Sequence, residues 1–137
     1  MPRELLADLA EAAAPVIAAT PPMRLRLAGA GRFGSVRRPS AAWAGLDGDV
    51  AALTELAVRL AGAARRLGLP VEDRPFRPHL TLGRWRPGQP ADGRLPERLA
   101  GYRGPAWPVR EVLLYESRLG PSPTYSVHQA YSCGAVR

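Results

Sequence analysis

Two histidines, His79 and His128, carry the only imidazole groups in the chain, so candidates for acid–base chemistry near neutral pH are few. His79 stands two residues before Thr81, in a His-x-Thr pattern. On a β-strand, residues two apart point to the same face, so the imidazole and the hydroxyl would lie side by side. Such a pair can share one phosphate group, because the imidazole transfers a proton while the hydroxyl donates a hydrogen bond to a phosphate oxygen. The spacing also suits a half-buried strand histidine that is hydrogen-bonded to Thr81.

The residues that flank the His-x-Thr pattern indicate which side chains would lie on the same face of the strand as His79. Leu80 and Leu82 fall on the opposite face and are expected to anchor the strand in the core. Arg84 comes five residues after His79, and strict alternation places it on the leucine face as well. Its guanidinium group can therefore reach a phosphate at His79 only if the strand ends or bulges after Leu82.

The second histidine is the weaker candidate for chemistry. His128 alternates with Val127, which is expected to face the core, so His128 is expected on the other side of its sheet. Ala130 occupies the position at which a His-x-Thr pattern would have threonine. We interpret His128 as a surface or cross-strand histidine rather than as a second catalytic group.

Composition limits the classes of protein that the chain can belong to. It has 137 residues, of which 46% are apolar and 23% charged, and these values exclude a wholly disordered protein. A formal net charge of +7 favours an anionic partner, such as a nucleic acid, a phosphorylated small molecule or an anionic membrane surface. All 19 basic residues are arginines, which is also typical of a GC-rich genome, so the choice of arginine adds little to the argument.

The cysteine count and the distribution of charges indicate where the protein is found. A single cysteine, Cys133, excludes an internal disulfide or a multi-thiolate metal site and is typical of a reducing compartment. The longest uncharged stretch, residues 12–23, contains three prolines and is shorter than the ~20 residues that a membrane-spanning helix needs. Acidic residues near the start are unlike a secretory signal. We therefore expect a cytoplasmic protein without a membrane-spanning segment.

Hydrophobic periodicity predicts both helices and strands. The expected helices cover residues 2–20, 50–67 and 96–102, and the expected strands cover residues 23–27, 41–46, 79–84, 109–117 and 125–132. A connector rich in glycine, proline and serine joins the last two strands, which therefore read as an antiparallel hairpin. Neighbouring strands joined by short turns predict a single α+β domain over residues 1–137, with mostly antiparallel sheets and helices packed outside.

The segment Phe76-Arg-Pro-His-Leu-Thr-Leu-Gly-Arg84 resembles the second His-x-Thr-x motif of the two-histidine (2H) phosphoesterases. It is most similar to the branch of 2′-5′ RNA ligase-like proteins, or RNA 2′,3′-cyclic phosphodiesterases. Three other segments also resemble this family, namely residues 27–33, 43–47 and 112–119. Together the resemblance covers nearly the whole chain. The resemblance implies a two-lobed α+β fold with one motif in each lobe.

The resemblance also implies a chemistry, which is hydrolysis of terminal 2′,3′-cyclic phosphates of RNA to 2′-phosphates without a metal or other cofactor. His79 would accept a proton from water, Thr81 would bind the phosphate, and Arg84 matches a basic residue that the family places near the phosphate. The backbone of Leu80 and Leu82 would border the substrate as part of the motif. Phe33 is a candidate for stacking on a nucleobase.

The sequence departs from the family in one respect, because it contains one His-x-Thr-x motif where relatives have two. The resemblance therefore predicts an incomplete copy of the fold, without the strand, helix and strand that carry the first motif. Because one positioned acid or base contributes about 10²–10⁴ in rate, the activity is expected to be impaired. An open sheet edge is expected to favour self-association. The alternative function is a non-catalytic module that binds RNA ends or nucleotide phosphates.

Overall fold

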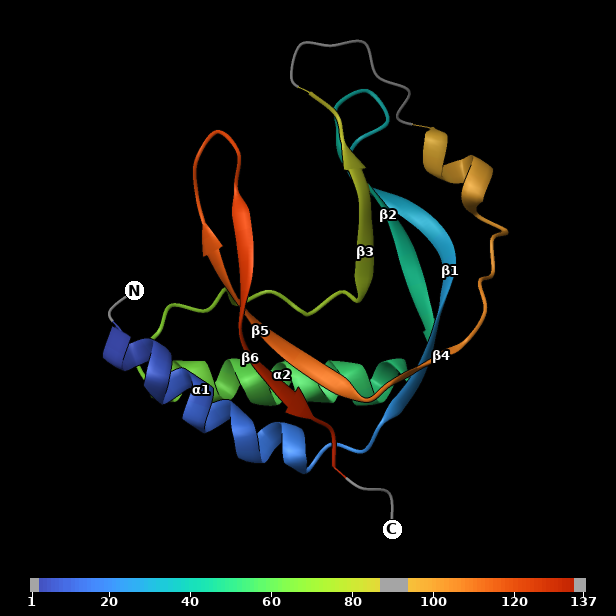
Figure 1. The fold of residues 1–137 in the computed structure, drawn as a ribbon. Helices are drawn as coiled ribbons and strands as arrows, with labels where there is room; N and C mark the ends of the chain where they lie inside the picture. Colours follow the sequence, from blue (N-terminus) through green and yellow to red (C-terminus); the bar gives the residue numbers. More distant parts are fainter. Residues whose placement is uncertain (1–2, 87–93, 135–137) are drawn as a thin grey trace. The chain divides into compact units, whose positions relative to one another are not determined.

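The structure is a computed structural model that describes residues 3–86 and 94–134. Its elements follow the chain in the order α1 (Arg3–Ala18), β1 (Met23–Gly34), β2 (Pro39–Gly48), α2 (Val50–Arg66), β3 (His79–Arg84), the 3₁₀ helix η1 (Leu95–Leu99), β4 (Trp107–Val109), β5 (Glu111–Arg118) and β6 (Thr124–Ser132) (Figure 1). Strands β3-β2-β1-β4 form one sheet in that order, and β5 and β6 form a second. The pairs β1–β2, β2–β3 and β5–β6 are antiparallel, which confirms the predicted α+β class.

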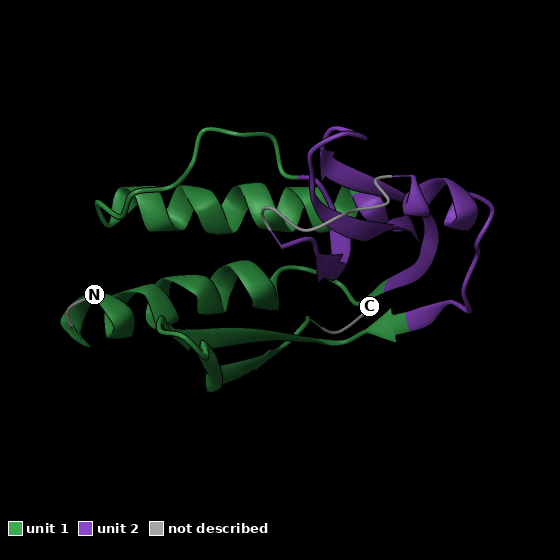
Figure 2. Ribbon diagram, turned by 90° about the horizontal axis from the view of Figure 1, so that it is seen from above, with its two compact units in different colours: residues 1–23, 51–76, 108–137 green, residues 24–50, 77–107 purple. Residues whose placement is uncertain are grey.

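Two compact units make up the chain, each built from separate stretches of sequence (Figure 2). Unit 1 contains residues 1–23, 51–76 and 108–137, and unit 2 contains residues 24–50 and 77–107. Unit 1 holds both long helices and the β5–β6 hairpin, apart from the first residue of α2. Unit 2 holds β2, β3 and η1 and most of β1, and therefore carries the His-x-Thr pattern.

The core of unit 1 lies among α1, α2 and β6. Ile17 and Met23 are almost completely buried, and Leu56 and Tyr131 pack with them. The Tyr131 hydroxyl donates a hydrogen bond of 2.7 Å to the backbone carbonyl of Ala10, which ties β6 to α1. Burial raises the pKa of the Tyr131 phenol, because the charged form would lose its hydration. This core therefore holds the hairpin against the first helix.

In unit 2, polar contacts hold the segment after β3 against β1. Arg32 donates to the Glu97 carboxylate over 2.5 Å, and this hydrogen bond lowers the pKa of the Glu97 carboxyl group. Backbone bonds from Gly29 to the Tyr102 carbonyl and from Gly104 to the Leu27 carbonyl continue the attachment. These contacts fix η1 and the following chain along β1.

Most predicted elements are present, and the differences have physical causes. β3 has the predicted bounds, and the predicted hairpin of β5 and β6 is confirmed. β1 continues beyond the predicted residues 23–27 to Gly34, because an irregularity in its pairing after Leu27 absorbs the glycines. The predicted helix over residues 96–102 is the shorter η1, and β4 is not among the predicted strands. Among the described residues, no helix is long and apolar enough to cross a membrane.

Two predictions about burial are wrong. Leu80 and Leu82 do not anchor β3 in a core, since they are 48% and 50% exposed. Val127 does not face the core either; it is 52% exposed, and its register partner is Tyr115 on β5. Alternation assigns residues to faces only where a strand is regular, and it does not say whether other elements cover a given face.

Candidate active site

Strand β3 lies at the edge of its sheet and brings the His-x-Thr pattern beside an aromatic strand. His79 pairs with Gly45 and Thr81 pairs with Trp43 of β2. Residues that oppose each other across an antiparallel pair present their side chains to the same face. The imidazole of His79, the hydroxyl of Thr81 and the indole of Trp43 therefore share one face of unit 2.

A β-bulge brings Arg84 to this same face. Between the pairs Trp43–Thr81 and Ala41–Arg84, β2 advances by two residues whereas β3 advances by three. The extra residue, Leu82, resets the alternation, so Arg84 follows the face of Ala41 and hence that of Trp43. From the sequence, Arg84 is expected to reach a phosphate at His79 only if the strand ends or bulges after Leu82. The structure contains such a bulge.

The hydrogen bond of His79 fixes which ring nitrogen is available for chemistry. Nδ1 lies 2.6 Å from the carbonyl oxygen of Arg77. A carbonyl can only accept, so Nδ1 carries the proton and the neutral ring keeps its lone pair on Nε2. His79 is exposed, and its hydrogen-bond partner is not Thr81, which rules out the alternative of a half-buried histidine bonded to that threonine. Nε2 is therefore placed to accept a proton from a water molecule.

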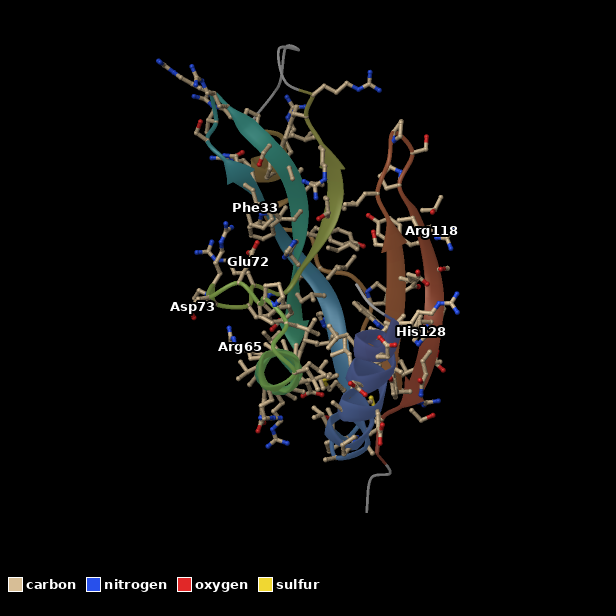
Figure 3. All side chains as sticks on the ribbon, turned by 90° about the vertical axis from the view of Figure 1, so that its left-hand side faces the viewer. Phe33, Arg65, Glu72, Asp73, Arg118 and His128 are labelled. Carbon is tan, nitrogen blue, oxygen red and sulfur yellow. The ribbon has the colours of Figure 1, made fainter. Side chains whose placement is uncertain are left out.

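Two aromatic rings hold the imidazole in place. Phe33 meets it edge-on with a centroid distance of 5.0 Å, and Trp43 lies 6.3 Å away at an interplanar angle of 60°. Phe33 and Trp43 also contact each other, with a centroid distance of 5.9 Å. Figure 3 shows Phe33 among the strands of unit 2. Phe33, a candidate from the sequence, is thus brought to the site.

Sequence reasoning missed the role of Trp43 at this site. Its indole lies across Gly31, its register partner on β1, and a Cβ atom built at Gly31 would stand 2.7 Å from Trp43 Cε2 and closer still to two other ring atoms. The available signal was a tryptophan in a strand of alanine and glycine, with a glycine-rich strand before it. Small residues of that kind leave room for a large ring to lie flat on a sheet.

The second histidine lies elsewhere in the fold. His128 is on the β5–β6 hairpin of unit 1 (Figure 3). The pairs Leu114–Gln129 and Tyr115–Val127 leave His128 as the extra residue of a bulge in β6. Its side chain is exposed, in agreement with the interpretation as a surface histidine.

Unit 2 contains a cavity beside η1. This cavity of about 200 Å³ is lined largely by apolar residues, which include Ala42, Leu95 and Leu99, and Trp43 and Arg84 line it as well. Ala42 neighbours Trp43 along β2, so their side chains point to opposite faces of the sheet. The cavity is therefore bordered by residues of both faces, including two that belong to the His79 face.

The net positive charge of the chain is carried by unit 2. Unit 2 contains eleven arginines and four acidic residues, for a formal net charge of +7, whereas unit 1 contains eight of each and is formally neutral. Within the described parts of the chain, no three histidine, cysteine or acidic side chains form a group that could hold a metal ion. Unit 2 is therefore the basic part of the chain, and its His79 face offers an imidazole, a hydroxyl and a guanidinium group.

Comparisons with known proteins identify the class. A family model described as the 2′-5′ RNA ligase superfamily matches residues 1–121. The RNA 2′,3′-cyclic phosphodiesterase of Geobacillus stearothermophilus is 34% identical over 134 residues, which are 96% of this chain and 41% of that protein. A protein of the same name from Thermus thermophilus is 35% identical, over 81% of this chain and 56% of that protein. The chain therefore belongs to the 2′-5′ RNA ligase superfamily and spans about half the length of these relatives.

Solved structures share its fold. A crystal structure of a Thermus thermophilus protein matches 97% of this chain and 72% of its own, with a TM-score of 0.78 and 28% identity. LigT of E. coli, solved in complex with 3′-AMP, matches with a TM-score of 0.73 and 24% identity, over 97% of this chain and 71% of its own. The predicted 2H phosphoesterase fold is thus confirmed.

Proposed function

We propose that this protein hydrolyses terminal 2′,3′-cyclic phosphates of RNA to 2′-phosphates, with His79 as proton acceptor. The observation that carries the proposal is the placement of His79, Thr81 and Arg84 on one face of β3, in a chain that belongs to the 2′-5′ RNA ligase superfamily. The two relatives described above are both named RNA 2′,3′-cyclic phosphodiesterase, which supports the same reaction here.

The roles follow from the chemistry of each group. His79 Nε2 accepts a proton from water, whose oxygen attacks the phosphorus atom, and the P–O3′ bond breaks to leave a 2′-phosphate. The Thr81 hydroxyl donates a hydrogen bond to a non-bridging oxygen. Arg84 stabilises the negative charge that develops on the phosphoryl group. The backbone of Leu80 and Leu82, on the edge strand β3, borders the phosphate, and Phe33 stacks on the terminal base.

The proton that the departing O3′ requires has no donor in this scheme. The family resemblance assigns it to the histidine of a first motif, and this sequence contains a single His-x-Thr-x motif. We therefore propose slow hydrolysis, with water supplying that proton. A cytoplasmic location, in keeping with a single cysteine and an RNA substrate, is part of the same proposal.

An assay with a short RNA that ends in a 2′,3′-cyclic phosphate tests the function. We expect slow conversion to the 2′-phosphate, resolved by chromatography, and a rate that falls in Thr81→Ala by about tenfold or more because one phosphate contact is lost. Thr124→Ala, an exposed threonine at the start of β6, is the matched control. No conversion by the wild-type chain at high enzyme concentration would contradict catalysis.

The alternative, a non-catalytic module that binds RNA ends or nucleotide phosphates, is favoured by one observation. The whole formal net charge of +7 lies in the unit that carries the motif. Such a module would bind the same RNA with a strong dependence on salt but would leave the cyclic phosphate intact. Binding without conversion would therefore select this function over the enzyme.

We also propose that the chain self-associates through β3. This strand is at the edge of its sheet and carries the half-exposed Leu80 and Leu82. An exposed edge with apolar side chains is a template for pairing with another strand. Sedimentation is expected to show a mass that rises with concentration, and less so in Leu80→Lys, which places a charge on the edge. A monomer at all concentrations would contradict self-association.

A further inference from the structure

Four arginines lie at the end of the sheet where β3 ends, at the opposite end of this strand from His79. Arg37 and Arg38 lie in the turn between β1 and β2, Arg84 ends β3, and Arg86 follows it. The β1–β2 turn and the end of β3 come together at the top of Figure 1. The pairing of Ala41 with Arg84 places them at the same end of the sheet.

Hydrogen bonds hold this end of the sheet in one conformation. Ser35 N donates to the Arg38 carbonyl over 3.2 Å, and Arg38 N donates to the Ser35 hydroxyl over 2.9 Å, so the turn is closed by two bonds. Trp85 N donates to the carbonyl of Ser40, which fixes the chain between Arg84 and Arg86 beside the turn. A preorganised surface loses less conformational entropy when it binds a ligand.

None of these four side chains is neutralised within the described residues. All four arginines are exposed, and their guanidinium groups form no ion pair or side-chain hydrogen bond in the parts of the chain that the structure describes. In the same unit, Arg32 and Arg103 are paired with Glu97 and Asp47. Arg24, Arg26 and Arg77 of the same unit likewise form no ion pair within the described residues, so the four arginines are distinguished by lying together at one end of the sheet.

From these observations we infer that Arg37, Arg38 and Arg86 form a second binding site, which takes the phosphodiester backbone of a single RNA strand whose cyclic end lies at His79. The inference rests on the proposed function and specifies its substrate as an oligonucleotide rather than a mononucleotide. Arg84 lies between the two sites, at the end of the strand that begins with His79. At about 3.3 Å per residue, the chain from His79 to Arg86 extends at most about 23 Å, enough for several linked phosphates.

Arginine suits this role for reasons of charge and shape. Its planar guanidinium group can donate two parallel hydrogen bonds to the oxygens of one phosphate. Contacts to backbone phosphates carry affinity without reading the base sequence, and each one releases condensed counterions. The affinity is therefore expected to depend on strand length and on salt.

Salt titrations of RNA binding test the second site. The probes are a hexanucleotide and a nucleoside monophosphate, each ending in a 2′,3′-cyclic phosphate, and the variant combines Arg37→Gln, Arg38→Gln and Arg86→Gln. We expect the wild-type chain to prefer the hexanucleotide and the variant to bind it about tenfold more weakly. The slope of log K against log salt is expected to be smaller by about 2, since each lost phosphate contact in a single strand contributes about 0.7.

A charge-matched control separates a site from a general effect of charge. The control combines Arg3→Gln, Arg66→Gln and Arg110→Gln, which are exposed arginines of unit 1, and is expected to retain the wild-type slope. Equal losses in both triple variants, or an unchanged hexanucleotide affinity in the first, would overturn the inference. So would loss of binding to phosphatidylserine vesicles in the first variant with RNA binding intact, because the ligand would then be a membrane surface.

The test of the second binding site does not require the chain to hydrolyse the cyclic phosphate. If the wild-type chain binds the hexanucleotide through these arginines but never opens the cyclic phosphate, the second site stands and the proposed catalysis fails. If it opens the cyclic phosphate of both probes at equal rates and with equal affinity, catalysis stands and the second site fails.

Discussion

Replacing His79 with glutamine is expected to lower the rate of cyclic phosphate hydrolysis by about 10²- to 10⁴-fold, the usual contribution of a positioned acid or base. Nε2 is the nitrogen that the hydrogen bond from Nδ1 to the Arg77 carbonyl leaves available. Glutamine retains a polar side chain of similar reach but has no group that accepts a proton near neutral pH. The measurement is the initial rate of conversion, with each protein at the same concentration.

The second histidine provides the matched control. His128→Gln makes the same chemical change on the exposed hairpin of unit 1 and is expected to leave the rate within about twofold of wild type. Because His79 is exposed, its replacement should leave the thermal unfolding of the chain nearly unchanged, since surface substitutions usually have small effects. Retained activity in His79→Gln would remove this residue from the chemistry, and equal losses in both variants would point to a general effect of losing a histidine.

The sequence predicts well whatever depends on short-range pattern. α2 repeats its apolar residues at helical spacing, and the predicted end near Leu67 is confirmed by Gly68, whose φ of +80° suits the residue after a helix. The bounds of β3 are predicted correctly because Pro78 precedes it and its residues alternate. Local chemistry of this kind is enough to place a strand, and with it His79 and Thr81.

Features that depend on how two strands pair cannot be predicted from the sequence alone. The face of Arg84 is set by a bulge at Leu82, which exists only in relation to the register of β2. The contact between Trp43 and His79 likewise requires that two strands, separated by α2 in the sequence, become neighbours in a sheet. An apolar side chain alone predicts a core position for Val127, whereas the bulge at His128 changes the alternation within β6.

Replacing Gly31 with alanine is expected to disturb the site from the strand behind it. The new Cβ would overlap the Trp43 indole, which packs against His79 and Phe33. A rigid ring cannot move aside as the end of a flexible side chain would, so the indole or the backbone of β1 must shift. Overpacking of this kind costs about 1–3 kcal/mol of unfolding free energy. Displacement of a catalytic group by about 1 Å can lower the rate by roughly 10²-fold.

Urea unfolding and hydrolysis rates measure the two effects of Gly31→Ala, and Gly83→Ala is the control. A Cβ at Gly83, on the motif strand itself, would meet nothing within 4 Å, and its φ is not positive. A cycle with Trp43→Leu shows whether Gly31 acts through the indole. If it does, the double variant loses no more activity than the more severe single variant. Losses that multiply, or a Gly31→Ala protein that matches Gly83→Ala in both stability and rate, would show that the indole does not position His79.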